Sequence, residues 1–550
     1  MRQLALAAVA AVAGAAAGLS FEPTHWFALL PLAVAVLTAV TAGRSLRSGA
    51  WLGLVFGTAF MLVLLPWLRV IGVYAWIPLA VVEGAFYALA GLATSALTRP
   101  RAGRPGRPVP TEGSTGVPGW PVWVACSWVL VELLRGSVPF GGFPWGRLAF
   151  AAEDTPVQPA LAYVGSAGAS FVIALVGTTA AWAVLRRSRA GRVTLRSTSV
   201  GVLGLLGAIA LAAVAGLVPW QATRPGDREV TIAAVQGNVP GQGLEAFAER
   251  RVVLDNHVEA TERFAERVSA GEAPRPDLVV WPENSSDIDP YTDLAARDAI
   301  GDAATEIGAP LLMGAVVDRG AGGRWYNRAI VWSTDGKPGA YYDKTHPVPF
   351  GEYIPLRSWL APLVPALKQI PEDMRPGTRP GVLQVGPART GVLMCFEVAY
   401  DGLVRDVVKG GADVVVVPTN NATYTGTGQV EQQFAMSRLR AVETGRYVVV
   451  ASTNGISGIV APDGHVVARA PQRTQAVLDQ RVTLIDRQTP ATEIGAWLER
   501  GLAAAGVLAV ALALAVRRRG PVQEGPGPVA VETSPTPAPT PVPTPAGTRG

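Results

Sequence analysis

The chain has 550 residues, of which 49% are hydrophobic and only 16% charged, with a net charge of +5. A soluble globular protein carries roughly 25% charged residues, so this composition argues against a purely soluble protein. Two cysteines exclude a disulfide framework, and four scattered histidines offer no metal-ligand spacing. We therefore expect no metal site. The positive charge is mostly arginine in short loops, which indicates membrane topology rather than a nucleic-acid partner.

Long apolar runs crowd residues 1–220 and return once near the C-terminus. A helix needs about 20 apolar residues to cross a bilayer. Eight runs satisfy or approach this length, at 3–19, 26–42, 50–68, 73–97, 120–135, 158–185, 199–219 and 496–516. We predict a polytopic bundle with seven spans inside residues 1–220 and the eighth at 496–516. Residues 1–19 also resemble a signal peptide, but another span follows at once and favours retention.

Arginines fill every second loop between the predicted spans. They lie before the first span and after the second, fourth, sixth and eighth, at Arg2, Arg44, Arg47, Arg99, Arg101, Arg104, Arg107, Arg186, Arg187, Arg189, Arg192, Arg196, Arg517, Arg518 and Arg519. Basic loops stay in the cytoplasm. We therefore expect both termini to be cytoplasmic and the segment between spans seven and eight to lie outside.

Charged residues inside predicted spans are candidate functional sites, and three of them are singled out here. These are Glu83 and the pair Glu132 and Arg135. The pair is spaced i,i+3 on one helix face, so it fits mutual neutralisation as well as a functional site. The following stretch, RGSVPFGGFPWGRLAF at 135–150, is rich in glycine, proline and aromatics, which predicts an irregular loop at the outer membrane interface.

Residues 228–487 have the pattern of one extracytoplasmic domain. Short β-branched runs alternate with amphipathic stretches at 244–269 and 428–445, which indicates a layered α/β or α+β fold. The runs are 229–236, 277–283, 309–317, 328–333, 390–397, 413–420 and 447–453. Beyond them, residues 520–550 are rich in proline and threonine, which predicts a disordered cytoplasmic tail.

Three of these predicted strands end close to reactive side chains. Glu283 ends the run VVWPE, Lys344 lies with Glu352 in YYDKTHPVPFGEYIP at 341–355, and Cys395 ends TGVLMC. A thiol needs a base to become a good nucleophile, and a buried carboxylate can be that base. A lysine can stabilise the oxyanion of acyl transfer. The pattern predicts an acyl-transfer site, although each residue alone also fits a structural role.

A second pairing joins Cys395 to His346, in the manner of cysteine proteases. His346 lies two residues after Lys344 in the same loop. The sequence shows no Asn or Asp placed to orient that histidine, which makes this the weaker pairing.

The chain resembles the carbon–nitrogen hydrolase (nitrilase) superfamily. Five motifs in order carry the resemblance: AAVQGNVP (233–240), VVWPENS (279–285), YYDKTHPVPFGEYIP (341–355), GVLMCFE (391–397) and VVVPTNNATY (415–424). Within it, the spans, WVLVELLRG (128–136) and GGFPWG (141–146) are similar to the apolipoprotein N-acyltransferase family. The resemblance covers residues 1–516.

The resemblance implies a four-layer αββα sandwich on a bundle of eight spans. It also implies the roles of five side chains: Glu283 the general base, Lys344 the oxyanion stabiliser, Cys395 the nucleophile, and Glu352 and Glu397 supporting acids that position Lys344. No metal or soluble cofactor is implied.

The implied reaction is ping-pong. A fatty acyl chain passes from a membrane phospholipid to the thiol and then to the amine of the diacylglyceryl-cysteine that begins an apolipoprotein. The implied location is the bacterial plasma membrane.

Two other functions fit the composition. One is a membrane-tethered amidase that hydrolyses an amide with water, and the other is a transporter-like protein whose outer domain binds lipid. Residues 354–370, IPLRSWLAPLVPALKQI, carry an apolar stripe that includes Trp359 and Leu363. The three prolines forbid a long regular helix. The stretch therefore fits a mobile lipid-facing arm or a hydrophobic loop packed on the domain.

Overall fold

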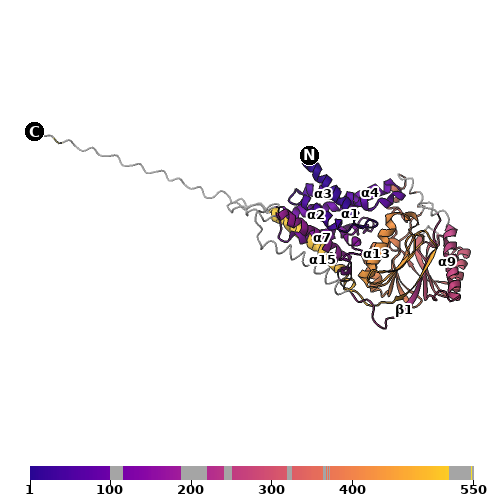
Figure 1. Ribbon diagram of the computed structural model, residues 1–550. Coiled ribbons are helices and arrows are strands. Elements are labelled where there is room, and N and C mark those ends of the chain that lie inside the picture. Colours follow the sequence, from indigo (N-terminus) through magenta and orange to yellow (C-terminus); the bar gives the residue numbers. More distant parts are fainter. Residues whose placement is uncertain are drawn as a thin grey trace.

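The structure, a computed structural model, describes residues 1–99, 116–187, 220–240, 250–318, 325–362 and 372–518, and the isolated residues 367, 370 and 547. A group of apolar helices joins a sandwich of two sheets (Figure 1). The predicted seventh span, at 199–219, lies outside the described residues, as does the predicted tail apart from Gly547.

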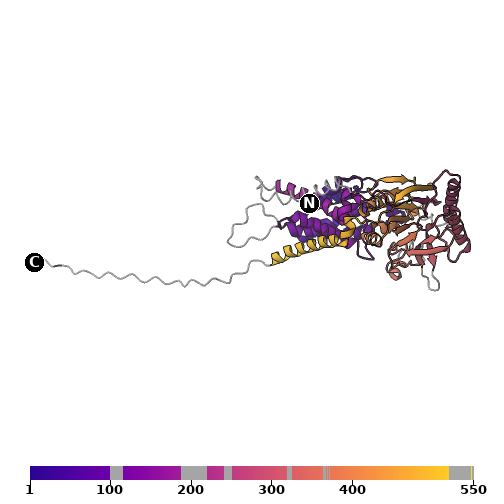
Figure 2. The same ribbon diagram turned by 90° about the horizontal axis from the view of Figure 1, so that it is seen from below.

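The apolar helices fall on the other seven predicted runs. They are α1 (Arg2–Gly18), α2 (Leu29–Thr41), α3 (Leu46–Leu64), α4 (Val73–Ala85), α5 (Tyr87–Thr98), α6 (Trp120–Arg135), α7 (Leu161–Arg187) and α15 (Ala496–Arg518). Four stretches of the described residues are long and apolar enough to cross a membrane: Leu46–Leu64, Val73–Thr98, Gln158–Arg186 and Ala496–Val516. Helix α15 packs against α6 and α7, so the C-terminal helix joins the helices formed by the first part of the chain (Figure 2).

Two of the predicted membrane spans, at 73–97 and 158–185, are not continuous helices in the structure. The run at 73–97 divides into α4 and α5 at Phe86. In α7, Gly165 has φ 63° and ψ −174°, a conformation open to glycine and costly for other residues. The Ser166 N–H beside this break donates to Glu443 Oε1 at 3.1 Å. A side chain from the sandwich therefore completes the hydrogen bonding of an apolar helix.

The sandwich contains two six-stranded sheets. The first has the order β12-β1-β2-β3-β4-β5, and the second has the order β11-β10-β9-β8-β7-β6. Neighbours β1, β2 and β3 run parallel, as do β7, β8 and β9. The strands are β1 (Glu229–Gln236), β2 (Leu278–Val280), β3 (Leu311–Asp318), β4 (Trp325–Trp332), β5 (Pro338–Asp343), β6 (Val382–Val385), β7 (Ala388–Val392), β8 (Val414–Thr419), β9 (Val448–Ser452), β10 (Gly458–Val460), β11 (Val466–Arg469) and β12 (Ala476–Thr483).

Helices cover both outer faces of the sheets. Helices α9 (Arg250–Ser269) and α10 (Leu294–Ile307) lie on the first sheet, and α12 (Asp401–Lys409) and α13 (Gly428–Thr444) lie on the second (Figure 1). Apolar side chains of both sheets meet in the middle, among them Val280, Leu312, Val392 and Val416. The predicted four-layer αββα sandwich is confirmed.

The apolar core beneath the second sheet does not end at its helical layer. One cluster of buried side chains joins Val415 of β8 and Leu439 of α13 to Phe60 of α3 and Trp128 of α6. Burying apolar surface is the main force that holds such layers together. The α12 and α13 layer is therefore packed between the sandwich and the apolar helices.

Candidate active site

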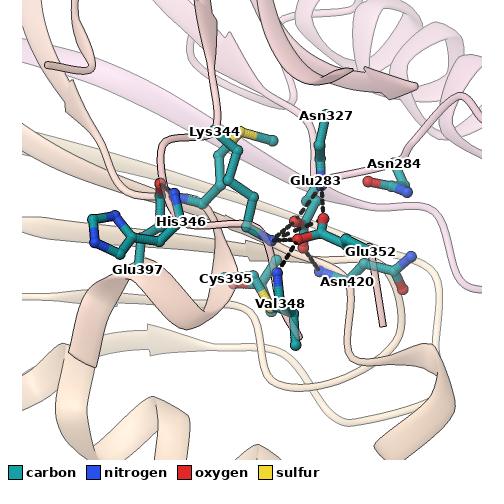
Figure 3. Close-up of polar contacts among 12 residues, drawn as sticks. Glu283, Asn284, Asn327, Lys344, His346, Val348, Glu352, Cys395, Glu397 and Asn420 are labelled. Atoms are coloured by element: carbon teal, nitrogen blue, oxygen red, sulfur yellow. Dashed lines mark hydrogen bonds and ion pairs between the residues drawn. The ribbon is translucent and has the colours of Figure 1, made fainter. Parts of the chain in front are cut away.

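The three residues predicted to do chemistry follow three strand ends. Glu283 lies three residues after β2, and Lys344 directly follows β5, both in the first sheet. Cys395 lies three residues after β7 in the second sheet. Figure 3 shows that their side chains converge from the two sheets. The fold brings together residues that are 112 positions apart at the extremes, as 395 minus 283 gives.

Lys344 lies between two carboxylates. Its Nζ is 2.7 Å from Glu283 Oε1 and 3.0 Å from Glu352 Oε2, and the lysine side chain is only 2% exposed (Figure 3). Burial alone would lower the pKa of Lys344, but the two carboxylates raise it well above its ordinary value. Lys344 is therefore an ammonium ion, and an ammonium stabilises negative charge that develops beside it.

Two asparagines that the sequence analysis did not single out orient these carboxylates. Asn327 Nδ2, from β4, donates to Glu283 Oε1 at 2.8 Å and to Glu352 Oε1 at 2.5 Å. The backbone N–H of Asn420 donates to Glu283 Oε2 at 3.0 Å. For Asn327, the available signal was a polar amide in a predicted buried strand region, since buried polar groups require partners. Glu283 is thus held by three donors, which are Lys344, Asn327 and the backbone of Asn420.

Cys395 stands on an unusual backbone. Its φ is 55°, which is rare for any residue other than glycine, and the 3₁₀ turn Cys395–Ala399 begins there. Such conformations concentrate at functional sites because the surrounding structure must maintain them. The strand predicted for 390–397 is therefore shorter, because β7 ends at Val392. The turn presents the half-buried thiol to the carboxylates and Lys344.

The thiol of Cys395 is protonated in this arrangement. Burial raises its pKa, the charge of Glu283 raises it further, and the Lys344 ammonium opposes both effects. A protonated thiol is a poor nucleophile, so this thiol would need a base to take its proton before it could attack a carbonyl carbon. Glu283 is the carboxylate whose charge and hydrogen bonding act on this thiol most strongly.

Glu397 does not lie with the other two glutamates. It accepts the backbone N–H of Thr345 at 2.7 Å and of His346 at 3.0 Å, and that of Met394 at 2.8 Å. Thr345 and His346 directly follow Lys344 in the chain, and Met394 directly precedes Cys395. Glu397 thus ties the loop that carries the lysine to the turn that carries the thiol, through the backbone rather than through the lysine itself.

His346 does not pair with the thiol. Its Nδ1 lies 3.3 Å from Thr345 Oγ1, and its ring packs on Tyr400 with centroids 4.2 Å apart. Figure 3 shows the ring pointing away from the ammonium end of Lys344. Burial and the charge of Lys344 lower its pKa. The alternative Cys395–His346 pairing is therefore not formed.

The loop after α6 packs on the nucleophile turn. Phe396 stacks on Phe143 with ring centroids 5.5 Å apart and on Trp145 at 5.7 Å. Tyr400 donates from its hydroxyl to Gly142 O at 2.9 Å. The predicted irregular loop is present, but Trp145 is buried against the site. The apolar helices therefore supply one wall of the site.

Arg135 of α6 organises that loop. It donates to Phe143 O at 2.8 Å and to Trp145 O at 2.6 Å, and it lies 3.4 Å from Glu83 Oε2. Glu132 instead accepts the Leu148 N–H at 2.7 Å. The charged residues of the predicted spans therefore hold the loop in place, whereas simple neutralisation between Glu132 and Arg135 does not describe their contacts.

A buried chain of charges ties the nucleophile turn to the apolar helices. Arg440 of α13 donates to Val398 O at 2.8 Å and Asp401 Oδ1 at 2.7 Å. Arg147, in the loop before α7, joins the same aspartate to Glu499 of α15, at 2.8 Å on each side. Buried charges persist only when they are paired, as here.

The predicted arm is described only in part. Trp359 lies in the short helix Arg357–Leu360 and is 77% exposed. Leu363 lies outside the described residues. Among the residues that the structure describes, no group of three or more His, Cys, Asp or Glu side chains could hold a metal ion.

Comparisons with known proteins agree with this architecture. The carbon-nitrogen hydrolase family matches residues 231–489, and the apolipoprotein N-acyltransferase N-terminal domain family matches residues 13–179. The apolipoprotein N-acyltransferase of Mycolicibacterium smegmatis is 38% identical over 522 residues, which cover 91% of this chain and 84% of that protein. The one from Chromobacterium violaceum is 30% identical, covering 94% of this chain and 96% of its own.

Solved structures also resemble the sandwich. An amidase of the nitrilase superfamily from Nesterenkonia AN1 is 21% identical, with a TM-score of 0.37. The match covers 51% of this chain and 99% of the amidase.

Proposed function

The chain belongs to the apolipoprotein N-acyltransferase family, and we propose that it transfers a fatty acyl chain from a membrane phospholipid to the N-terminal amine of diacylglyceryl-cysteine in apolipoproteins. One observation carries the proposal. A half-buried thiol stands beside a buried ammonium held by two carboxylates, on a layer that shares its core with apolar helices. Such a site suits an acyl donor that never leaves the bilayer.

The first half-reaction forms a thioester. The Cys395 thiol attacks the phospholipid ester carbonyl while Glu283 takes the thiol proton. A carbon–sulfur bond forms, the carbon–oxygen bond of the ester breaks, and Glu283 returns the proton to the departing oxygen. Lysophospholipid leaves, and the acyl chain stays on Cys395. A carboxylate that alternates between base and acid serves both steps.

The second half-reaction releases the chain. The amine of diacylglyceryl-cysteine attacks the thioester, a carbon–nitrogen bond forms, and the carbon–sulfur bond breaks. Glu283 takes the proton that the amine loses, and the proton then returns to the Cys395 sulfur. Both half-reactions pass through a tetrahedral oxyanion, and Lys344 is the cation beside it. Removing a donor to an oxyanion costs about 10²–10³ in rate.

The supporting residues divide into two kinds. Glu352 and Asn327 hold Lys344 and Glu283 in position through the hydrogen bonds described above. Glu397 holds the two loops together. The exposed Trp359, with Leu363 beyond it, would form a lipid-facing arm at this site.

The arginine pattern supports a topology for this reaction. Residues 1–220 and 496–516 would form the membrane part, and residues 228–487 the catalytic domain on the outer side of the bacterial plasma membrane. Both termini would then be cytoplasmic, with the tail 520–550 there as well. Lipoprotein acceptors anchored in the outer leaflet would meet the site directly.

The intact mass of the purified protein tests the proposal. After incubation with phospholipid and no acceptor, we expect one added fatty acyl group that hydroxylamine releases and that is absent from Cys395→Ala. A diacylglyceryl-cysteine peptide should discharge it. Discharge to water at the same rate without the peptide would favour a membrane-tethered amidase instead. Acylation that persists in Cys395→Ala would overturn the assignment of the nucleophile.

A further inference from the structure

Gln433 of α13 lies beside the nucleophile, and the mechanism above does not use it. The Cys395 Sγ is 3.9 Å from Gln433 Oε1, within range of a hydrogen bond from the thiol. Gln433 is buried, so its amide must find its partners inside the protein. If the amide oxygen faces the thiol, Gln433 accepts a hydrogen bond from it. If the amide nitrogen faces the thiol, Gln433 donates one to the sulfur.

A chain of hydrogen bonds that begins at a backbone N–H reaches this amide. The Gly455 N–H donates to Ser452 Oγ at 2.9 Å, and the Ser452 hydroxyl donates to Asn421 Oδ1 at 3.2 Å. The Asn421 amide nitrogen donates to Gln433 Oε1 at 3.0 Å. These bonds all run toward Gln433 Oε1, and a carbonyl oxygen only accepts.

The other end of the network agrees. Gln429 Nε2 donates to Gln433 Oε1 at 2.7 Å, and Gln433 Nε2 donates to Thr419 Oγ1 at 3.1 Å. The Thr419 hydroxyl in turn donates to Val417 O. The carbonyl oxygen of Gln433 therefore faces Cys395. A carbonyl oxygen accepts a hydrogen bond from a thiol and repels a thiolate.

We propose that Gln433 is a positioning residue that accepts the hydrogen bond of the Cys395 thiol and keeps the thiol protonated until an acyl donor arrives. The inference rests on the proposed function, because it assigns the thiol a resting state between turnovers. On arrival of the ester, the proton passes to Glu283, and the sulfur leaves Gln433 for the carbonyl carbon.

Four ionisable groups also act on this thiol. Glu283 and Glu352 oppose its ionisation, and Lys344 favours it. Tyr424 lies in the 3₁₀ turn Ala422–Tyr424. Burial raises the pKa of the Tyr424 hydroxyl, and a negative charge on Cys395 raises it further. Gln433 differs from these groups because it carries no charge. Its effect therefore stays constant across the range in which the others titrate.

Two substitutions should move the ionisation of the thiol in opposite directions. Gln433→Leu removes the acceptor, so the thiol should ionise at lower pH. Gln433→Glu retains the shape and the acceptor oxygens but adds a negative charge, so ionisation should require higher pH. A loss of hydrogen bonding alone cannot produce both shifts. The isosteric Gln433→Glu also remains informative if Gln433→Leu folds poorly.

Alkylation of Cys395 by iodoacetamide measures this directly and needs no substrate. The full-length protein in detergent is first treated with hydroxylamine, and the modified cysteine is identified by peptide mass. A hydrogen bond of this kind is worth about 2- to 10-fold in an equilibrium. At about pH 7.5, we expect alkylation about 2- to 10-fold faster than wild type in Gln433→Leu, and slower in Gln433→Glu.

Gln432 provides a matched control on the same helix. It is also buried, but it accepts hydrogen bonds from Trp67 and Trp145 and donates to Glu22 O and Leu64 O rather than bonding to the thiol. Gln432→Leu should leave the pH profile of Cys395 alkylation unchanged. Shifts of the same sign in both Gln433 variants, or no shift in Gln433→Glu, would overturn the inference. The readout follows the sulfur alone, so failure of the proposed acyl transfer would leave it measurable.

Discussion

The Lys344 ammonium lies 2.7 Å from Glu283 Oε1, and both side chains are nearly inaccessible to solvent. A buried ion pair is costly to break, because the remaining charge has no partner. The same contact joins the proposed oxyanion cation to the proposed base. Chemistry and stability therefore depend on one pair of atoms.

Replacing Lys344 with methionine should abolish thioester formation. The oxyanion would lose its cation, which costs about 10²–10³ in rate. Glu283 and Glu352 would also face each other without a counter-ion, so thermal stability should fall. Lys344→Arg keeps the charge but cannot fit its larger head between the two carboxylates, and it should also be slow. Single-turnover acylation followed by intact mass measures both variants, and wild-type rates in Lys344→Met would contradict the oxyanion role.

Glu397 should matter for position rather than for proton transfer. Both its oxygens accept backbone N–H groups, so Glu397→Gln would point an amide N–H at one of these donors. Misplacing the Lys344 loop by about 1 Å against the Cys395 turn could cost about 10²-fold in acylation rate. Tyr342→Phe is the control, because it leaves the three backbone N–H bonds to Glu397 in place and removes a hydroxyl that donates to this carboxylate and accepts the Thr345 N–H at 3.3 Å. An equal loss in both variants would show that the backbone contacts are not the cause.

Much of the site could be predicted because its motifs lie at strand ends. Strand pairing places Glu283 and Lys344 at one edge of the first sheet, and packing of the second sheet against the first brings Cys395 to them. Asn327 and Gln433 could not be found this way, because they lie inside a strand and a helix, and the site residues that they contact are 25 to 44 and 38 positions away in the chain. The residues around each of them in the sequence indicate only an ordinary strand for Asn327 and an ordinary helix for Gln433.

The edges of the sheets also escaped prediction. Strand β12 is half-exposed along most of its length, so it lacks the continuous apolar run of a buried central strand. The break at Gly165 in α7 depends on Glu443, which lies 277 positions away from the N–H that it accepts. Local sequence patterns cannot predict contacts between residues that are so far apart in the chain.

His257 should make the sandwich sensitive to acid. It is buried in α9, and burial lowers its pKa from 6.5 to about 4. As the pH falls below 6.5, the unfolded chain binds a proton that the folded chain cannot, so stability decreases until the folded pKa is reached. The loss would approach about 3 kcal/mol when complete and about 2 kcal/mol near pH 5.

Thermal unfolding of His257→Gln tests this dependence. The difference in Tm between about pH 7.5 and pH 5 should be smaller in the variant than in wild type, because glutamine does not titrate. His465 is exposed, so His465→Gln serves as the control and should retain the wild-type difference. An unchanged difference in His257→Gln would show that the buried histidine does not drive acid unfolding.

The topology can be tested with a reporter that is active only in the cytoplasm. Fused after residue 225, it should be silent, because the arginine pattern places that point outside. Fused after Arg187, beside the basic loop that follows α7, it should be active. Strong activity at 225 would place the active site on the cytoplasmic side, where anchored lipoproteins could not reach it.

The proposed lipid arm depends on two side chains, Trp359 and Leu363. Trp359 is 77% exposed, seven residues after Glu352 in the chain, and such exposure is costly in water but favourable against lipid. Aspartate at both positions should slow acylation by vesicle phospholipid about 10-fold or more, because a charge near the bilayer interior is expensive. The domain should remain folded, since an exposed side chain contributes little to its core.

Leu294 separates this effect from a general loss of surface hydrophobicity. It is 67% exposed at the start of α10, on the outer face of the first sheet. Leu294→Asp should leave acylation unchanged. Detergent-dispersed phospholipid gives a second comparison, because a donor that is already out of the bilayer does not need an arm to reach it. If the arm variants are equally slow with dispersed and vesicle phospholipid, the defect lies in the catalytic site and the arm does not guide the donor.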